Sequence, residues 1–126
     1  MQIEVSLGEL IDKVSILEIK QKNIRDENKL AHVSHELAKL YPLMEHIRLT
    51  PSSLEFQQLL AINETLWQLE NRIRAKEKQQ TFDDEFISIA RQIYISNDER
   101  AAIKNRINTE YRSEIVEEKE YFGYRD

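Results

Sequence analysis

Several charged residues lie beside the apolar stripes of expected helices, where they could bind a ligand. Arg91 lies between Ile87 and Tyr94, and Arg100 and Lys104 flank an isoleucine further along the chain. If such groups meet at one end of a helical bundle, they can recognise a phosphate or a carboxylate. They can equally be surface ion pairs and long side chains that cover apolar surface. The second interpretation is favoured, because flanking charges are common on amphipathic helices.

Two more charged sets have the same ambiguity. Asp12 and Lys13 lie beside the apolar stripe of the first expected helix. Glu70, Arg74 and Glu77 occur at spacings of four and three, which suit ion pairs within one helix. These residues belong either to a binding cluster or to a solvated helix face.

The three histidines are the next candidates for chemistry. His32 and His35 are three residues apart, so they share a helix face and could chelate one ion. Glu36 lies beside them, but no third ligand follows at a recognised metal-site spacing, and His46 is separate. We therefore interpret them as solvated side chains and predict no metal site.

Two carboxylate pairs have the spacing of a magnesium site. Glu9 and Asp12 are three residues apart, as are Glu114 and Glu117. Similar pairs on facing central helices hold magnesium in all-α nucleotide pyrophosphatases, because hard cations prefer carboxylate oxygens. Here one pair lies in a helix-capping turn and the other in a segment without periodicity. A capping turn and an acidic tail are the favoured interpretation, and no cofactor is predicted.

The sequence contains none of the common catalytic fingerprints. Gly8 and Gly123 are too isolated to form a P-loop, a dinucleotide-binding turn or a nucleophile elbow. The chain has no cysteine, which excludes disulfides, thiol catalysis and thiolate metal sites. The sequence therefore leaves open whether the protein is an enzyme.

Length and composition indicate the framework that must position these groups. The 126 residues are 40% hydrophobic and 33% charged, which suits a single domain over residues 1–126. Two glycines and two prolines are too few for the turns of a sheet protein, so the composition favours an all-α fold.

Net charge and apolar segments limit the partners. A net charge of −5 argues against a generic binder of nucleic acid or anionic membranes. No segment approaches the ~18 apolar residues that span a bilayer, and the N-terminus lacks the order of a signal peptide. We expect no nucleic-acid or membrane partner, and a cytoplasmic location.

Apolar periodicity and capping residues predict about five helices. Ser6-Leu7-Gly8-Glu9 is a capping box that starts the first helix, and this helix should end near Arg25. Asp26 is predicted to cap a second helix, in preference to one continuous helix through residue 25. Pro42 could kink or end that second helix. The predicted starts of the remaining three helices are Ser52-Ser53-Leu54-Glu55, Thr81-Phe82-Asp83-Asp84 and Ser96-Asn97-Asp98-Glu99.

These helices should pack as a compact antiparallel bundle. The tail, residues 113–126, loses the periodicity and carries Tyr121, Phe122 and Tyr124, so it is either docked or flexible. Some apolar stripes are broad enough to leave a face for another chain. We therefore expect a homo-oligomer, with a protein partner as another possibility.

The sequence also resembles a small, uncharacterised bacterial family. The resemblance rests on five segments: Gly8–Lys13 with Ile16–Lys20, Leu66–Glu77, Phe82–Tyr94, Asn97–Asn108 and Ile115–Tyr121. It covers most of the chain, and the family has no assigned catalytic residues. One departure is Tyr111-Arg112, where the family pattern has a glycine near the end of the last helix.

The resemblance draws attention to the polar positions inside the matching segments. The candidate polar cluster comprises Glu9, Asp12, Lys13, Glu70, Arg74, Arg91, Asn97, Asp98, Arg100 and Lys104. If these residues converge, they form either a structural ion network or a binding site. We predict a helical protein that acts by self-association or protein–protein interaction. The alternative is a small enzyme or ligand-binding protein for a phosphorylated or acidic small molecule, such as a nucleotide or nucleotide-sugar, with or without magnesium.

Overall fold

A computed structural model of the chain describes residues 1–116 and residue 123. All regular secondary structure in these residues is helical, which confirms the all-α prediction. The helices are α1 (Leu7–Asn23), α2 (Glu27–His46), α3 (Leu54–Lys78) and α4 (Asp84–Glu110). The described part of the chain therefore has four helices where the sequence predicted about five.

Three of the four described helices begin with a side-chain capping hydrogen bond. The Ser6 hydroxyl accepts a hydrogen bond from the Glu9 amide at 3.1 Å, and the Asp26 carboxylate accepts one from the Lys29 amide at 3.0 Å. The predicted break at Asp26 is therefore confirmed. The Asp83 carboxylate likewise accepts from the Phe86 amide at 2.9 Å. Each side chain satisfies an amide that has no partner within its own helix.

The capping box predicted at Ser52-Ser53-Leu54-Glu55 is wrong in register. The residue before α3 is Ser53, and its side chain makes no capping hydrogen bond. Its hydroxyl donates instead to the carbonyl of Thr50, within the loop. Pro42 lies inside α2, and the helix continues past it to His46.

The predicted fifth helix is the second half of α4. The helix runs without a break from Asp84 to Glu110, so Ser96-Asn97-Asp98-Glu99 starts no new helix. Ser96 is buried and lies in phase with Ile89, Ile103 and Ile107, all buried on the same side of α4. Packing of this side outweighs the local preference of a serine for a cap.

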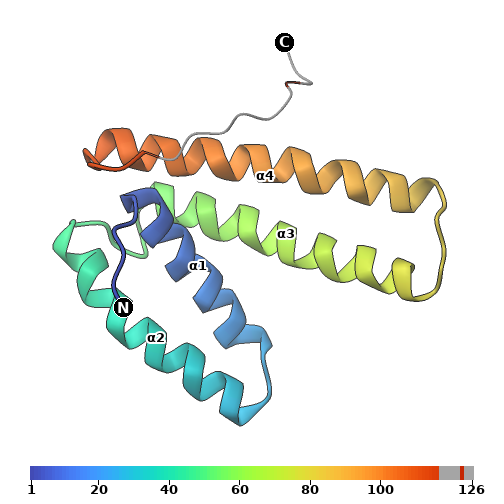
Figure 1. Cartoon of the computed structure of the whole chain (residues 1–126), viewed down its shortest axis with the longest axis horizontal. Helices are drawn as coiled ribbons and strands as arrows, with labels where there is room; N and C mark the ends of the chain where they lie inside the picture. The colour runs from blue at the N-terminus through green and yellow to red at the C-terminus, as the bar shows by residue number, and fades with distance from the viewer. Residues whose placement is uncertain (117–122, 124–126) are drawn as a thin grey trace.

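The helices form two hairpins that lie at an angle to each other (Figure 1). α3 and α4 are long, antiparallel and adjacent along their length, and α1 packs against both. The backbone of α2 approaches only that of α1, on the side away from the α3–α4 hairpin, and the Met44 side chain of α2 reaches into the apolar cluster. α1 is thus the central helix, and the arrangement is layered rather than a bundle of helices around one axis.

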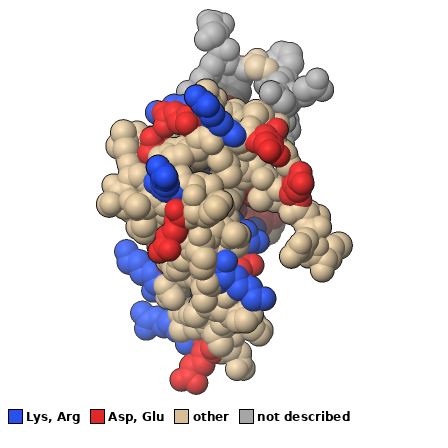
Figure 2. Space-filling model, turned by 90° about the vertical axis from the view of Figure 1, so that its left-hand side faces the viewer, with Lys and Arg blue, Asp and Glu red and all other residues tan. Residues whose placement is uncertain are grey.

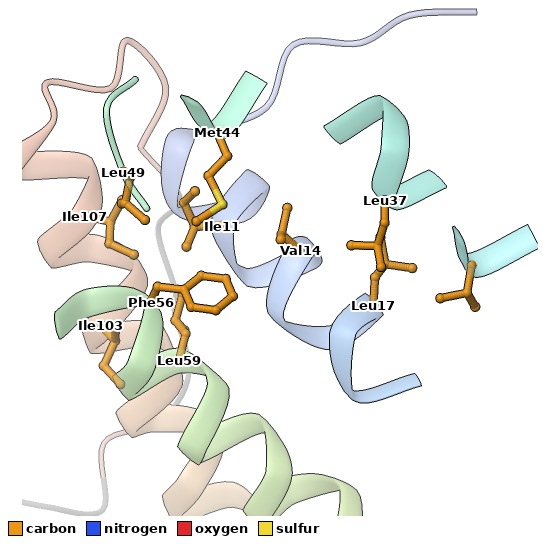
Figure 3. Packing of buried hydrophobic residues seen from close by; sticks show 11 residues of the cluster. Ile11, Val14, Leu17, Leu37, Met44, Leu49, Phe56, Leu59, Ile103 and Ile107 are labelled. Atoms are coloured by element: carbon orange, nitrogen blue, oxygen red, sulfur yellow. The ribbon is translucent and has the colours of Figure 1, made fainter. Parts of the chain in front are cut away.

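One apolar cluster joins the two hairpins (Figure 3). Its buried members come from every helix and from the α2–α3 loop: Ile11, Val14, Leu17, Val33, Leu37, Met44, Leu49, Phe56, Leu59, Ile103 and Ile107. Phe56 and Leu59 face Ile11 and Met44 in the middle of this cluster. The cluster holds α1 in place against α3 and α4, which is the setting of the candidate site.

The start of the tail returns to the first helix. The Ser113 hydroxyl accepts a hydrogen bond from the Leu7 amide at 3.0 Å and donates one to the Ile115 carbonyl at 2.6 Å. Tyr121, Phe122 and Tyr124 lie outside the described residues. None of the described helices is long and apolar enough to cross a membrane.

Candidate binding site between α1, α3 and α4

The Asp12 carboxylate is the centre of a buried polar network. Asp12 lies on α1, and its side chain is 1% exposed. Arg100 of α4 binds both carboxylate oxygens, through Nε to Oδ1 at 3.0 Å and through Nη2 to Oδ2 at 2.5 Å. Asn63 of α3 donates to Oδ1 at 2.8 Å and to the Ser15 hydroxyl, also at 2.8 Å. One carboxylate therefore connects three helices.

Lys104 extends this network by one helical turn. Its ammonium nitrogen donates to Glu9 Oε2 at 2.7 Å and lies 3.9 Å from Asp12 Oδ2. The Lys104 side chain is only 9% exposed. A buried cation is tolerated when it is paired and hydrogen-bonded, and two carboxylates supply those partners here.

The first backbone amides of α1 have hydrogen-bond partners, most of them in α4 and in the residues after it. The Gly8 amide donates to Asn108 Oδ1 at 2.7 Å, and the amides of Leu7 and Glu9 bond to Ser113 and Ser6. A Cβ atom at Gly8 would lie 2.4 Å from the Lys104 carbonyl oxygen, so only glycine allows this close approach. These amides are already bonded, and they offer no anion site.

A cleft opens beside the network where α1 diverges from the hairpin. Its volume is about 320 Å³. Arg100, Asn63, Asn97 and Trp67 line it. Its remaining lining residues are Ile16, Ile19, Leu66, Glu70, Asn71 and Arg74. The cleft is therefore apolar on the side of α1, and amides and charged groups occupy the side of α3 and α4.

The structure brings seven of the ten predicted residues to this region. Glu9, Asp12, Arg100 and Lys104 form the network, and Asn97 accepts from Arg100 Nη1 at 3.5 Å. Glu70 and Arg74 line the cleft and form an exposed ion pair at 3.5 Å. The predicted convergence therefore occurs, mostly as contacts between the residues themselves.

The other three predicted residues lie elsewhere. Lys13 pairs with Glu36 of α2 at 3.6 Å, on the surface between α1 and α2. Arg91 is exposed and Asp98 is half-buried on α4, and neither lines the cleft.

Metal binding has no support in the described part of the chain. His32, His35 and His46 are all exposed. Within residues 1–116 and 123, no group of three or more histidine or acidic side chains has the arrangement to hold an ion. Glu117, the second member of one carboxylate pair, lies outside the described residues.

Sequence reasoning missed the neutral members of the network. Asn63 lies in phase between Leu59 and Leu66 on the apolar stripe of α3, and this position was a visible signal of a buried amide. Asn108 follows Lys104 by one turn and is also buried. Polar residues inside an apolar stripe would have identified both.

The clear pKa shifts lie outside the cleft. The hydroxyl of Tyr41 on α2 donates to Glu18 Oε1 of α1 at 2.6 Å, and burial together with this carboxylate raises the pKa of Tyr41 to about 12. At the α3–α4 turn, a hydrogen bond from Lys76 to Asp83 raises the pKa of Lys76. The amide of Phe86 and then the Lys76 ammonium lower the pKa of Asp83. These pairs strengthen contacts between neighbouring helices and create no reactive group.

The cleft among the described residues combines guanidinium groups, amides and an apolar wall. Among the described residues, no serine, lysine or histidine combines with a base in the cleft. The basic groups of the network are already matched by carboxylates. On the face shown in Figure 2, basic and acidic side chains are interspersed over the surface. That face offers no extended basic patch for a polyanion.

The comparisons with known proteins give one result. A family described as "Family of unknown function (DUF6165)" matches residues 1–124. No curated protein and no solved structure matches the chain.

Proposed function

The chain belongs to the DUF6165 family, whose function is unknown, and we propose that it acts by self-association through α4. The observation that carries this proposal is a pair of large, exposed apolar side chains on one side of α4. Ile87 is 55% exposed and Tyr94 is 45% exposed. They are seven residues apart, so they lie on the same side of the helix.

The position of these residues supports an interaction surface. The end of the α3–α4 hairpin that joins the two helices extends beyond α1 and α2 (Figure 1). Phe82, at this end, is 54% exposed. Large apolar side chains grouped on a projecting element are typical of a protein–protein contact, whereas scattered ones need no explanation.

Sedimentation of the full chain tests this function. We expect the wild type to associate at micromolar to high-micromolar concentration, and Ile87→Glu to shift it to a monomer, because the new charge would be buried in the contact. Leu43→Glu is the matched control: Leu43 is 52% exposed on α2, away from α4. It should leave the association unchanged. A wild type that stays monomeric at high concentration would contradict the proposal.

The cleft supports a second candidate function, the binding of a small acidic or phosphorylated molecule. Arg74 and Arg100 supply guanidinium groups to the cleft, and Trp67 supplies a flat apolar wall. Trp67 is the single tryptophan of the chain, so its fluorescence reports directly on this cleft.

A titration monitored by Trp67 fluorescence, with and without magnesium, tests the second candidate. Nucleotides, nucleotide-sugars and inorganic phosphate are the probes. A saturable change that Arg74→Ala weakens would support the ligand function. The same titration with Lys13→Ala is the control, because Lys13 lies outside the cleft. No saturable change with any probe would count against it.

A further inference from the structure

We propose that two copies of this chain pair through the outward faces of their α4 helices, in antiparallel orientation, about a two-fold axis that crosses the helix between Tyr94 and Ile95. This inference rests on the proposed self-association and adds its geometry. It assigns a role to Arg91 and Asp98, the two residues of the predicted cluster on α4 that belong neither to the buried network nor to the cleft.

The outward face of α4 forms a continuous stripe. Ile87, Arg91, Tyr94 and Asp98 follow one another at spacings of four, three and four residues. At 3.6 residues per turn, these side chains lie on one side of the helix. The buried residues Ile89, Ser96, Ile103 and Ile107 occupy the opposite side, against α3. Among the described residues, the stripe therefore lies on the side of α4 opposite the one that packs on the other helices.

The charges on this stripe are complementary to themselves in one orientation only. In an antiparallel pair about the proposed axis, Arg91 lies opposite Asp98 of the second copy, and the symmetry repeats the contact. In a parallel pair, each Arg91 would lie against Arg91 of the second copy. Within the described residues, Arg91 and Asp98 form no ion pair in their own chain. Charge pattern therefore selects the antiparallel pair.

The remaining side chains of the stripe fit the same register. Ile87 lies opposite Ala102 of the second copy, where a small residue leaves room for a large one. Asp84 lies opposite Asn105 of the second copy, whose amide can donate to its carboxylate. Tyr94 lies next to the axis, where two copies of the ring meet. Each of these contacts occurs twice, as an isologous interface requires.

Charge reversal tests the register. Arg91→Asp gives a stripe with two acidic groups and Asp98→Arg gives one with two basic groups, so each variant alone should associate at least about tenfold more weakly than the wild type. The double variant restores both pairs and should return to within about threefold of wild-type affinity. An equimolar mixture of the two single variants should form a heterodimer as tight as the wild-type dimer. Circular dichroism of each variant should show unchanged helix content.

Crosslinking supplies a second measurement that does not depend on charge. The chain has no cysteine, so Tyr94→Cys introduces a single thiol, which should give a disulfide-linked dimer on mild oxidation. Gln92→Cys, on an exposed side of α4 away from the stripe, should not.

The outcomes separate the register from the self-association itself. The antiparallel register is overturned if the wild type is a dimer but the double variant does not restore association and Tyr94→Cys does not crosslink. That result leaves the proposed self-association standing. A monomeric wild type overturns both. Rescue together with crosslinking at position 94 supports the inference.

Discussion

At the scale of single residues, Asp12 is a charged group enclosed between three helices. Removing a carboxylate from water costs several kcal/mol, and apolar groups of the same volume often stabilise a protein as well as a buried ion pair does. What the pair provides here is geometry, because Arg100 bonds both oxygens at once. This bidentate contact, with Asn63, fixes the rotation of α1 relative to α3 and α4.

Asp12→Asn should strongly destabilise the protein. The amide cannot accept from both guanidinium nitrogens and the Asn63 amide, so Arg100 loses its bidentate contact with a buried carboxylate. We expect the free energy of unfolding to fall by roughly 3–5 kcal/mol in urea denaturation. Lys13→Gln, next in sequence, breaks an exposed pair with Glu36 and should cost less than about 1 kcal/mol. Similar losses for both variants would contradict the structural role of Asp12.

Gly8→Ala should destabilise the protein although alanine is the better helix former. The added Cβ would lie 2.4 Å from the Lys104 carbonyl oxygen, which is backbone and cannot rotate away. α1 must then move from α4, which weakens the Gly8–Asn108 hydrogen bond. We expect a loss of about 1–3 kcal/mol, against a gain in helix propensity of about 1 kcal/mol where no clash exists. Thermal unfolding measures it, and a raised melting temperature would refute the close contact.

At the scale of elements, local capping signals predicted the starts of α1, α2 and α4 but not a helix break at Ser96. Ser6 and Asp26 act as expected because no strong packing competes with them. Ser96 does not, because a cap contributes only about 1 kcal/mol, while a break in α4 would remove several backbone hydrogen bonds and the packing of Ile103 on α3. Which of these preferences wins depends on contacts between helices, and one sequence does not display those contacts.

The open end of the α3–α4 hairpin, where α3 starts and α4 ends, should respond to pH. A hydrogen bond with Glu55, in the first turn of α3, raises the pKa of Glu110, the last residue of α4. The pKa of Glu110 is higher in the folded state than in the unfolded state. The protein should therefore become more stable as the pH falls through the folded-state pKa, and the gain should be complete below the unfolded-state pKa of about 4.3.

Replacement of either carboxylate isolates this effect. Glu110→Gln should raise the melting temperature near pH 7, where the wild type holds two adjacent charges, and the difference should vanish below about pH 4. Glu55→Gln should behave alike, because it removes the other member of the pair. A difference that is constant between pH 4 and 7 would show that the two carboxylates do not interact.

At the scale of the whole molecule, the sequence predicted the kind of site better than its role. The positions of Glu9, Asp12, Arg100 and Lys104 beside apolar stripes made convergence one of two interpretations, and the structure brings these residues together. The contact between Arg100 and Asp12, 88 residues apart, depends on how α1 crosses the α3–α4 hairpin. The crossing is set by the shapes of many apolar side chains, which helical periodicity alone does not specify.

The layered arrangement predicts that α2 opens before the other helices. α1 packs on every other helix, whereas α2 approaches α1 alone, so α2 can separate without disrupting α3 and α4. Native-state hydrogen exchange should therefore show an opening free energy for the first half of α2 well below that of α1 and the centre of α4.

Leu37→Ala removes a buried side chain that packs toward Leu17, and should lower protection mainly in α2. Leu59→Ala, in α3, should lower protection in α1, α3 and α4 by the same free energy and leave that of the first half of α2 unchanged, because α2 opens while the cluster around Phe56 stays folded. Equal protection of α2 and α1 in the wild type would show that the four helices unfold as one unit, and that α1 does not act as the central support.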